Sequence, residues 1–247
     1  MGVISSESIF HFTRSKDKLL SILKNEFQPH FCFERCVLGN RVIKGAYPMV
    51  CFCDIPLSQV KEHIGEHYGD YGIGMSKRWA EKKGLNPVLY IKKTSHLAAH
   101  IKALVEISRS TEELKTNMQK TLISILRYVK PFEGNYLRGE KIQDKIKFYD
   151  ERELRYVPPP ETTNNRHLFL TTEQYKNSKI RGQFDSIIGQ LRLSFEPDDI
   201  RYIIIKDEDE ISSIVHELPR IKEKYSYGTV QKLLTRIITT EQIKRDF

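Results

Sequence analysis

Apolar and polar positions along the chain follow two periods, one typical of strands and one typical of helices. Runs of aromatic and branched residues predict strands at 8–13, 48–53, 87–91, 148–157, 184–188 and 200–205, and a turn followed by a strand at 69–75. Apolar residues spaced three and four apart predict helices at about 17–26, 56–67, 76–83, 95–127 (two helices or one broken helix), 208–217 and between 228 and the C-terminus. The remaining segments are expected to be connections, at 30–47, 128–147 and 158–181. Strands and helices do not alternate strictly, so the predicted class is α+β.

Size and composition indicate one globular domain. The chain has 247 residues, 39% of them hydrophobic, which is enough for a sizeable core. We therefore expect a single α+β domain over 1–247, with a mostly helical insertion around 95–127. No apolar run is long enough to cross a membrane, and no basic segment precedes a long apolar one near residue 1. The sequence therefore predicts a cytoplasmic protein without a membrane partner.

The charge balance favours acidic partners. The formal net charge is +8 and the pI is near 9.2, which suits polyanions such as RNA, DNA or a dinucleotide. Simple solubility is the alternative, because acids are interspersed and no block of five basic residues occurs. Cysteines stand at positions 32, 36, 51 and 53, and in a reducing compartment we expect free thiols.

Charged residues interrupt the predicted strand at 148–157. In a regular strand Glu151, Glu153 and Arg155 share one face. Two carboxylates this close repel each other and resist burial, which indicates a functional site. The alternative is an edge strand whose acids form ion pairs with Arg152, Arg155 or neighbouring lysines.

A histidine and a threonine lie among the apolar residues of the first predicted strand, at His11 and Thr13. Such a histidine either serves a site or is a core residue bonded to the backbone. The functional hypothesis places His11 and Glu153 on adjacent central strands that face one cleft.

Patterns typical of metal or phosphate sites are present but incomplete. His63-Ile-Gly-Glu-His67 matches a zinc-peptidase pattern, yet no third ligand region follows it. The cysteines lack the two-residue gap of a zinc ribbon, so no metal is expected. The glycines of 69–74 lack the dinucleotide-binding spacing and predict a turn with a close backbone approach.

Five blocks in the same order carry a family resemblance: Ser8-Ile-Phe-His-Phe-Thr13, Pro48-Met-Val-Cys-Phe-Cys-Asp-Ile-Pro-Leu-Ser58, Tyr71-Gly-Ile-Gly74, Trp79 with Gly84-Leu-Asn-Pro-Val-Leu-Tyr90, and Glu151-Arg-Glu-Leu-Arg-Tyr-Val-Pro158. They resemble the AbiGi family of bacterial abortive-infection proteins, over most of 8–205. The second and fifth blocks are the most specific, although Leu154 stands where many relatives are expected to have a tryptophan. The resemblance implies the antitoxin of a two-gene phage-defence system.

A second resemblance concerns chemistry. The strand with His11-Phe-Thr13, the helix after it and the late Glu151-x-Glu153 resemble ADP-ribosyltransferases. That resemblance implies split mixed and antiparallel sheets with flanking helices. It implies that Glu153 is the catalytic carboxylate, that Glu151 orients or activates the acceptor, and that His11 and Thr13 hold NAD.

The other NAD-binding residues implied by this resemblance are an aromatic side chain and an arginine. Tyr71 is the first choice for stacking on nicotinamide, with Phe52 and Tyr47 as substitutes. Arg155 would hold the Glu153 carboxylate or contact the pyrophosphate. A carboxylate stabilises the oxocarbenium-like transition state of NAD cleavage, and because cationic nicotinamide leaves readily, no metal is required.

Two functions are therefore expected. The first is an NAD-dependent ADP-ribosyltransferase-like toxin of a phage-defence system, which modifies nucleic acid or protein. The alternative is a non-catalytic antitoxin or binding protein of a toxin–antitoxin pair, whose cognate partner is encoded by a neighbouring gene. The sequence alone assigns neither the acceptor nor the oligomeric state.

Overall fold

The computed structural model describes residues 6–65, 68–110, 115–138, 141–163 and 168–247. The chain divides into two compact units, with separate clusters of buried hydrophobic residues in each. Unit 1 comprises Met1–Gln28, Cys51–Leu85 and Arg192–Phe247, and unit 2 comprises Pro29–Val50 and Asn86–Leu191. The single domain over 1–247 stays a prediction, and the helices expected at 95–127 belong to unit 2.

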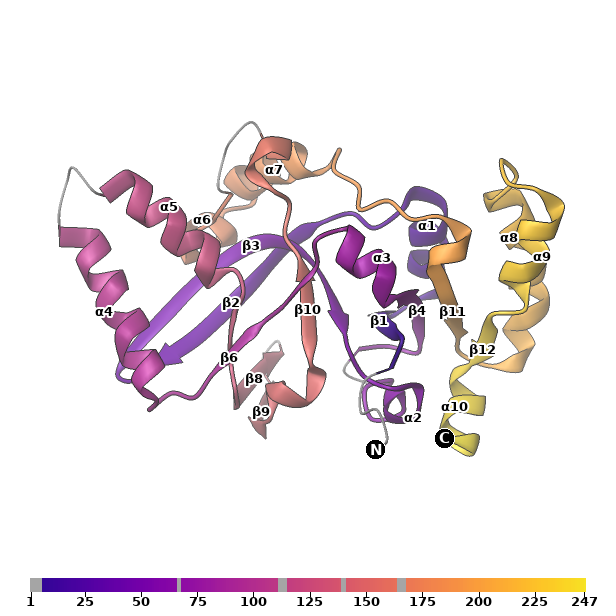
Figure 1. The fold of residues 1–247 in the computed structure, drawn as a ribbon, viewed down its shortest axis with the longest axis horizontal. Helices are drawn as coiled ribbons and strands as arrows, with labels where there is room; N and C mark the ends of the chain where they lie inside the picture. The colour runs from indigo at the N-terminus through magenta and orange to yellow at the C-terminus, as the bar shows by residue number, and fades with distance from the viewer. Residues whose placement is uncertain (1–5, 66–67, 111–114, 139–140, 164–167) are drawn as a thin grey trace. The chain divides into compact units, whose positions relative to one another are not determined.

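Eight strands form one mixed sheet, in the order β12-β11-β4-β1-β3-β10-β5, with β2 paired to β3 (Figure 1). These strands are β1 (Ser8–Thr13), β2 (His30–Leu38), β3 (Arg41–Cys53), β4 (Tyr71–Ser76), β5 (Asn86–Pro87), β10 (Glu153–Tyr156), β11 (Ile200–Ile205) and β12 (Ile237–Thr239). β11 and β12 are parallel, whereas β4 pairs antiparallel with both β1 and β11. The α+β class with flanking helices is confirmed, and the ADP-ribosyltransferase arrangement stays a prediction.

In unit 1, helices pack around β1, β4, β11 and β12 (Figure 1). They are α1 (Lys16–Asn25), α2 (Leu57–Val60), α3 (Lys77–Lys82), α8 (Ile211–Ile221), α9 (Tyr227–Leu234) and α10 (Thr240–Asp246). The Ser15 side chain accepts a hydrogen bond from the Lys18 backbone N–H at 3.3 Å and so caps α1. The same helix buries Leu19 and Leu23 completely. The helix predicted at about 17–26 is therefore confirmed, with its start one residue earlier.

A glycine in β4 allows the aromatic packing of unit 1. A Cβ at Gly74 would lie 2.8 Å from Cδ2 of Tyr202 and 3.0 Å from Cε1 of Phe10. Without that Cβ, the rings of Phe10 and Tyr202 stack with their centroids 5.8 Å apart. The close backbone approach predicted for 69–74 is confirmed.

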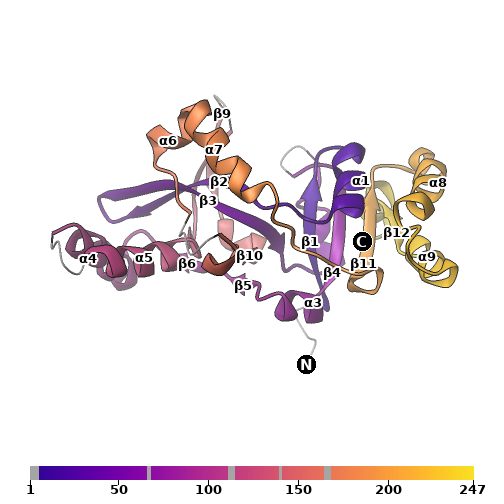
Figure 2. The same ribbon diagram turned by 90° about the horizontal axis from the view of Figure 1, so that it is seen from above.

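Unit 2 is built on a long hairpin of β2 and β3 (Figure 2). The two strands pair from Leu38 opposite Arg41 to His30 opposite Met49. Gly39 has a φ of 61°, which suits the first position of a two-residue hairpin turn. The loop predicted for 30–47 is therefore wrong. Charged residues interrupt the alternation there, and Gly39-Asn40 is the sequence signal of the hairpin turn.

The rest of unit 2 consists of short strands and four helices. They are β6 (Leu89–Ile91), β7 (Val129–Pro131), β8 (Gly134–Arg138), β9 (Lys141–Ile146), α4 (His96–Ser110), α5 (Lys115–Leu126), α6 (Thr172–Lys176) and α7 (Ser178–Ile188). α4 and α5 pack against each other, which confirms two helices within 95–127. Ala98 and Ile101 of α4 join the core that contains Leu38 and Val129.

Other predicted elements differ from the structure. The connection at 128–147 contains β7, β8 and β9, and the strand at 184–188 lies inside α7, which Asn177 caps. The helix predicted to start at 56 ends as α2 at Val60. The strand predicted from 148 begins only at β10, after a 3₁₀ helix at Phe148–Glu151. Further 3₁₀ helices are at Pro160–Thr163, Pro197–Asp199 and Glu208–Glu210.

None of the helices within the described ranges has the length and hydropathy that crossing a bilayer requires.

Candidate functional site

Five charged side chains of unit 2 meet in a charge cluster, made of Glu34, Lys130, Glu151, Glu153 and Arg155. They come from β2, β7, the 3₁₀ helix before β10, and β10 itself. The Arg155 side chain is fully buried and that of Glu153 is 4% exposed. Burial of charges is costly unless each is paired, so the contacts between these groups determine what the cluster can do.

Arg155 organises one side of the charge cluster. Its Nε lies 2.5 Å from Oε1 of Glu153, and its Nη1 donates to the backbone carbonyl of Arg127 at 2.6 Å. Its Nη2 lies 3.1 Å from Oε1 of Glu34. One planar guanidinium therefore joins β10 to β2 and to the chain just before β7.

Lys130 organises the other side. Its ammonium contacts Oε2 of Glu151 and lies 2.5 Å from Oε2 of Glu153. It also lies 5.3 Å from the centroid of the Phe148 ring. Both oxygens of Glu153 are thus engaged, one by Arg155 and one by Lys130. The expected repulsion between the two acids is relieved because a cation lies between them.

These pairings shift the ionisation of the buried groups. Burial alone would raise the pKa of Glu153, but the charges of Arg155 and Lys130 and their hydrogen bonds lower it to about 2. Burial alone would lower the pKa of Lys130, but Glu153 and Glu151 hold it well above its ordinary value. Glu153 therefore remains an anion near neutral pH. It suits electrostatic stabilisation of a cation rather than proton transfer.

Glu34 behaves in the opposite way. Burial raises its pKa, and the neighbouring Arg155 only partly offsets this because the charge of Glu153 opposes ionisation. Burial and the charge of Glu34 also raise the pKa of Cys36 to about 11 and that of Tyr47 to about 12. The anionic form of Glu34 is therefore less favoured than that of Glu153.

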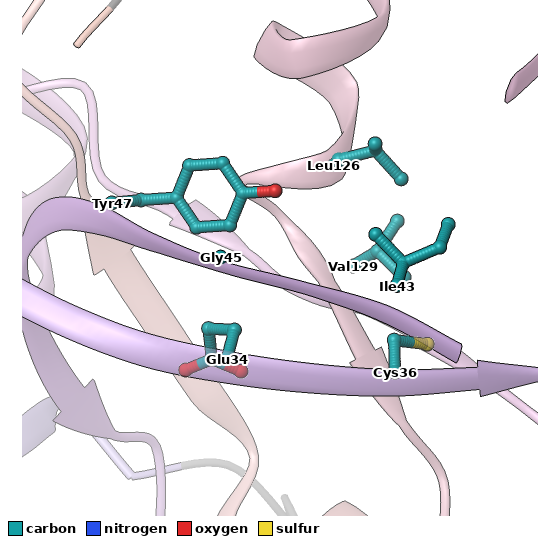
Figure 3. Close-up of a pocket in the computed structure, with 7 residues that line it drawn as sticks. All are labelled: Glu34, Cys36, Ile43, Gly45, Tyr47, Leu126 and Val129. Carbon is teal, nitrogen blue, oxygen red and sulfur yellow. The ribbon is translucent and has the colours of Figure 1, made fainter. Parts of the chain in front are cut away.

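A small cavity adjoins Glu34 (Figure 3). Its lining consists of Glu34, Cys36, Ile43, Gly45, Tyr47, Leu126 and Val129. The space open to the centre of a water molecule is about 10 Å³, room for about one water. Tyr47 lines this cavity, and its role in stacking on nicotinamide stays a prediction.

The backbone around Glu153 explains how both acids reach one lysine. Arg152 adopts a left-handed conformation with a φ of 43°, so Glu151 is not on the strand face predicted for it. The Glu153 N–H donates to the Tyr90 hydroxyl at 2.8 Å. β10 lies between β3 and β5, so it is not an edge strand. The ion pairs of the alternative interpretation are present, but its edge position is wrong.

The other predicted site residues belong to unit 1. Nδ1 of His11 lies 2.8 Å from the carbonyl oxygen of Cys51, a geometry in which Nδ1–H donates. Its ring lies 5.5 Å from that of Phe52 and 5.2 Å from that of Phe27, centroid to centroid. Phe52 is buried. These contacts are those of a core histidine bonded to backbone, and the role in binding ribose stays a prediction.

Thr13 and Tyr71 are directly opposite each other on β1 and β4. The Tyr71 hydroxyl donates to Oε1 of Glu210 at 2.9 Å, and burial together with this hydrogen bond raises its pKa to about 12. The structure thus groups Thr13 with Tyr71, and His11 with Phe52. In the sheet order β3 separates β1 from β10, so the prediction that His11 and Glu153 lie on adjacent strands is wrong. A shared pocket stays a prediction.

Comparison with known proteins identifies the family. The family model described as "Putative abortive phage resistance protein AbiGi, antitoxin" matches residues 17–206. The chain belongs to the AbiGi family. An abortive phage resistance protein AbiGi of Lactococcus lactis subsp. cremoris is 26% identical over 232 residues, which cover 84% of this chain and 92% of that protein. No solved structure matches the chain.

The sequence of this AbiGi chain did not predict two members of the charge cluster, Glu34 and Lys130. Glu34 and Lys130 lie in segments that were predicted to be connections. The signals available were the aromatic-rich alternation of 30–38 and the short Val129-Lys-Pro131 run. Neither indicates that the two side chains meet Arg155, because that contact depends on the tertiary pairing of β2, β7 and β10.

In the described part of this AbiGi chain, no group of three or more His, Cys, Asp or Glu side chains is arranged to bind a metal ion. Glu66 and His67 of the zinc-peptidase pattern lie outside the described residues. Cys32 and Cys51 are half-buried and Cys36 and Cys53 are buried.

Proposed function

We propose that this chain is the antitoxin of a two-gene phage-defence system and acts by binding its cognate toxin, a protein. The family description names an antitoxin. The observation that carries the proposal is the state of Glu153: this carboxylate is 4% exposed, and internal cations engage both of its oxygens. A catalytic carboxylate must reach substrate, whereas a structural one must be satisfied within the fold.

The charge cluster then serves the scaffold that presents a binding surface. Lys130 and Arg155 both contact Glu153 and so join β7 to β10, and loss of that carboxylate would leave two buried cations without their shared partner. The antitoxin needs no cofactor for this role.

Coexpression tests the proposal. The protein encoded by the neighbouring gene should stop growth when expressed alone, and coexpression of this chain should restore growth. The two proteins should also copurify at a fixed ratio. Growth arrest by this chain alone, relieved by the neighbour, would contradict the proposal because it assigns the two roles the other way round.

The second candidate is an ADP-ribosyltransferase that modifies nucleic acid or protein. What favours it is that Glu151 and Glu153 converge on one cation, Lys130. The ribosyl cation formed as nicotinamide leaves NAD would take the place of that ammonium. In this candidate Glu153 is the catalytic carboxylate, and Glu151 orients the acceptor. His11, Thr13, Tyr71 or Phe52, and Arg155 bind NAD, and no metal takes part.

Transfer of label from NAD tests this candidate. The purified chain is incubated with adenine-labelled NAD and either total RNA, DNA or cell lysate. Transfer by the wild type that Glu153→Gln abolishes supports the enzyme, provided that circular dichroism shows the variant to be folded. Glu151→Gln is the comparison variant and should disturb the fold less than Glu153→Gln, because the ion pair of Glu151 is with Lys130 alone. Absence of transfer to every acceptor removes this candidate.

A further inference from the structure

Helix α4 has two apolar faces, and only one of them is covered. Ala98, Ile101 and Val105 are buried, and the first two join the core with Leu38 and Val129. On the other side Leu97 and Leu104 are each 43% exposed and Ile107 is 50% exposed. Solvated helix faces are normally polar, so this second face requires an explanation.

The exposed residues follow the spacing of a helix-packing seam. Leu97, His100, Leu104 and Ile107 are separated by three, four and three residues, which is the a–d–a–d pattern of a heptad repeat. All four are exposed, and we call them the α4 seam. At about 1.5 Å per residue the α4 seam is about 15 Å long. This length suits about three turns of one partner helix, with His100 as the polar position that sets the register.

Two exposed lysines precede the α4 seam in the chain. They are Lys92 and Lys93, which lie just before the first residue of α4. The one acid in the described part of α4, Glu106, lies 3.4 Å from Arg41 and 3.9 Å from Lys102. Its charge is therefore already balanced. An apolar seam preceded by two exposed lysines is complementary to an amphipathic helix with acidic flanks.

The division of charge between the two units supports the same partner. By sequence, unit 1 has 19 basic and 19 acidic residues, whereas unit 2 has 21 basic and 13 acidic residues. The entire net charge of +8 is therefore carried by unit 2. Two copies of this unit would repel each other, and an acidic partner would be attracted.

We propose that the α4 seam binds an amphipathic helix of the cognate toxin, one with an apolar stripe and acidic flanks. This rests on the proposed antitoxin function and adds where the toxin binds and with what chemistry. The apolar stripe supplies the contact that persists at high salt, and the acidic flanks supply attraction that salt weakens.

The test compares binding of the purified neighbouring-gene protein by three forms of the full chain. Leu97→Ser with Leu104→Ser should raise the dissociation constant at least tenfold, as measured by titration calorimetry. These side chains are already exposed, so the melting temperature should change little. Val215→Ser, at an aliphatic residue of α8 in unit 1 that is 40% exposed, should leave the dissociation constant unchanged.

The outcomes separate this proposal from the antitoxin function. If the wild type binds and the double variant binds equally well, the α4 seam is not the interface, but the antitoxin function stands. If the wild type does not bind at all, both proposals fail. Sedimentation of the chain alone completes the test: a dimer that dissociates in the double variant would make a second copy the occupant and overturn the proposal.

Discussion

Glu34 and Glu153 are carboxylates within contact of the same guanidinium, yet their environments push their ionisation in opposite directions. Glu153 receives two cations and stays charged. Glu34 shares Arg155 with Glu153 and feels the charge of that acid. The same residue type therefore makes opposite contributions to the pH dependence of stability, and one substitution at each position can separate them.

We expect Glu153→Gln to lower the free energy of unfolding by about 3 kcal/mol at pH 7. The folded pKa of about 2 is below the ordinary 4.5. The stability that Glu153 contributes is therefore present above pH 4.5 and is lost as the pH falls toward 2. The difference between variant and wild type should shrink over that range, as measured by urea unfolding at a series of pH values.

Glu34→Gln is the matched comparison, because its folded pKa is raised rather than lowered. The folded state then favours the neutral acid, which glutamine resembles, so this variant should be at least as stable as the wild type at pH 7. A loss as large as that of Glu153→Gln would contradict the opposite roles assigned to the two acids.

Among single residues, the sequence predicted that Glu151 and Glu153 are unusual but did not predict which side chains they contact. Glu151 and Glu153 stand out because carboxylates are rarely so close in a predicted strand. Lys130 and Glu34 do not stand out, since a lysine or glutamate in a polar segment is ordinary. Their roles arise from burial, and burial here depends on contacts between residues that are distant in the sequence.

The β2–β3 hairpin is the element on which unit 2 depends most. Its strands carry Glu34, and the backbone of Ala46 exchanges two hydrogen bonds with that of Leu170. A Cβ at Gly45 would lie 2.0 Å from Cε2 of Phe169. The ring of Phe169 therefore occupies space that only glycine leaves open on β3.

We expect Gly45→Ala to lower the free energy of unfolding by about 2 kcal/mol, because the Phe169 ring has to move out of its place. Thermal unfolding followed by circular dichroism measures the change. Gly182→Ala is the control: it lies inside α7 with nothing within 4 Å of the added Cβ, and should raise stability by about 0.5–1 kcal/mol. Equal effects at the two glycines would contradict the packing of Phe169.

Helices and strands were predictable where the hydrophobic residues follow one clear period and, for helices, where an N-cap residue marks the start. β1, α1 and α3 were placed well because Ser15 and Ser76 mark helix starts. The hairpin and the strands of 128–147 were missed because charges interrupt their alternation. The short apolar run at 184–188 predicts a strand, but it belongs to α7, one continuous helix over Ser178–Ile188 that begins directly after its cap Asn177.

For the whole molecule, the uneven division of charge matters most. A neutral unit and a unit of +8 are encoded in interleaved segments of one chain. Association with an acidic partner should therefore depend on lysines of unit 2 and hardly on those of unit 1. The family was predictable from the order of its sequence blocks, and the family match confirms it, whereas neither unit nor charge division was evident before the contacts were known.

We expect Lys92→Glu with Lys93→Glu to slow association with the neighbouring-gene protein about tenfold at low ionic strength, and much less at 0.5 M salt. Stopped-flow fluorescence measures the rate. Lys18→Glu with Lys24→Glu changes the net charge equally on α1 of unit 1, where both lysines are exposed. An equal loss of rate in both pairs would mean that only total charge matters.

Arg155 has one further consequence. A guanidinium keeps its proton at every pH at which the protein folds, and here no part of the side chain remains in contact with solvent. Water must leave this permanent cation before β2, β7 and β10 can close around it. Dehydration of one ion is therefore an obligatory event in the assembly of unit 2. Lysine, with a single point charge, could not replace a fork that donates to Glu153 and to the Arg127 carbonyl while it pairs with Glu34.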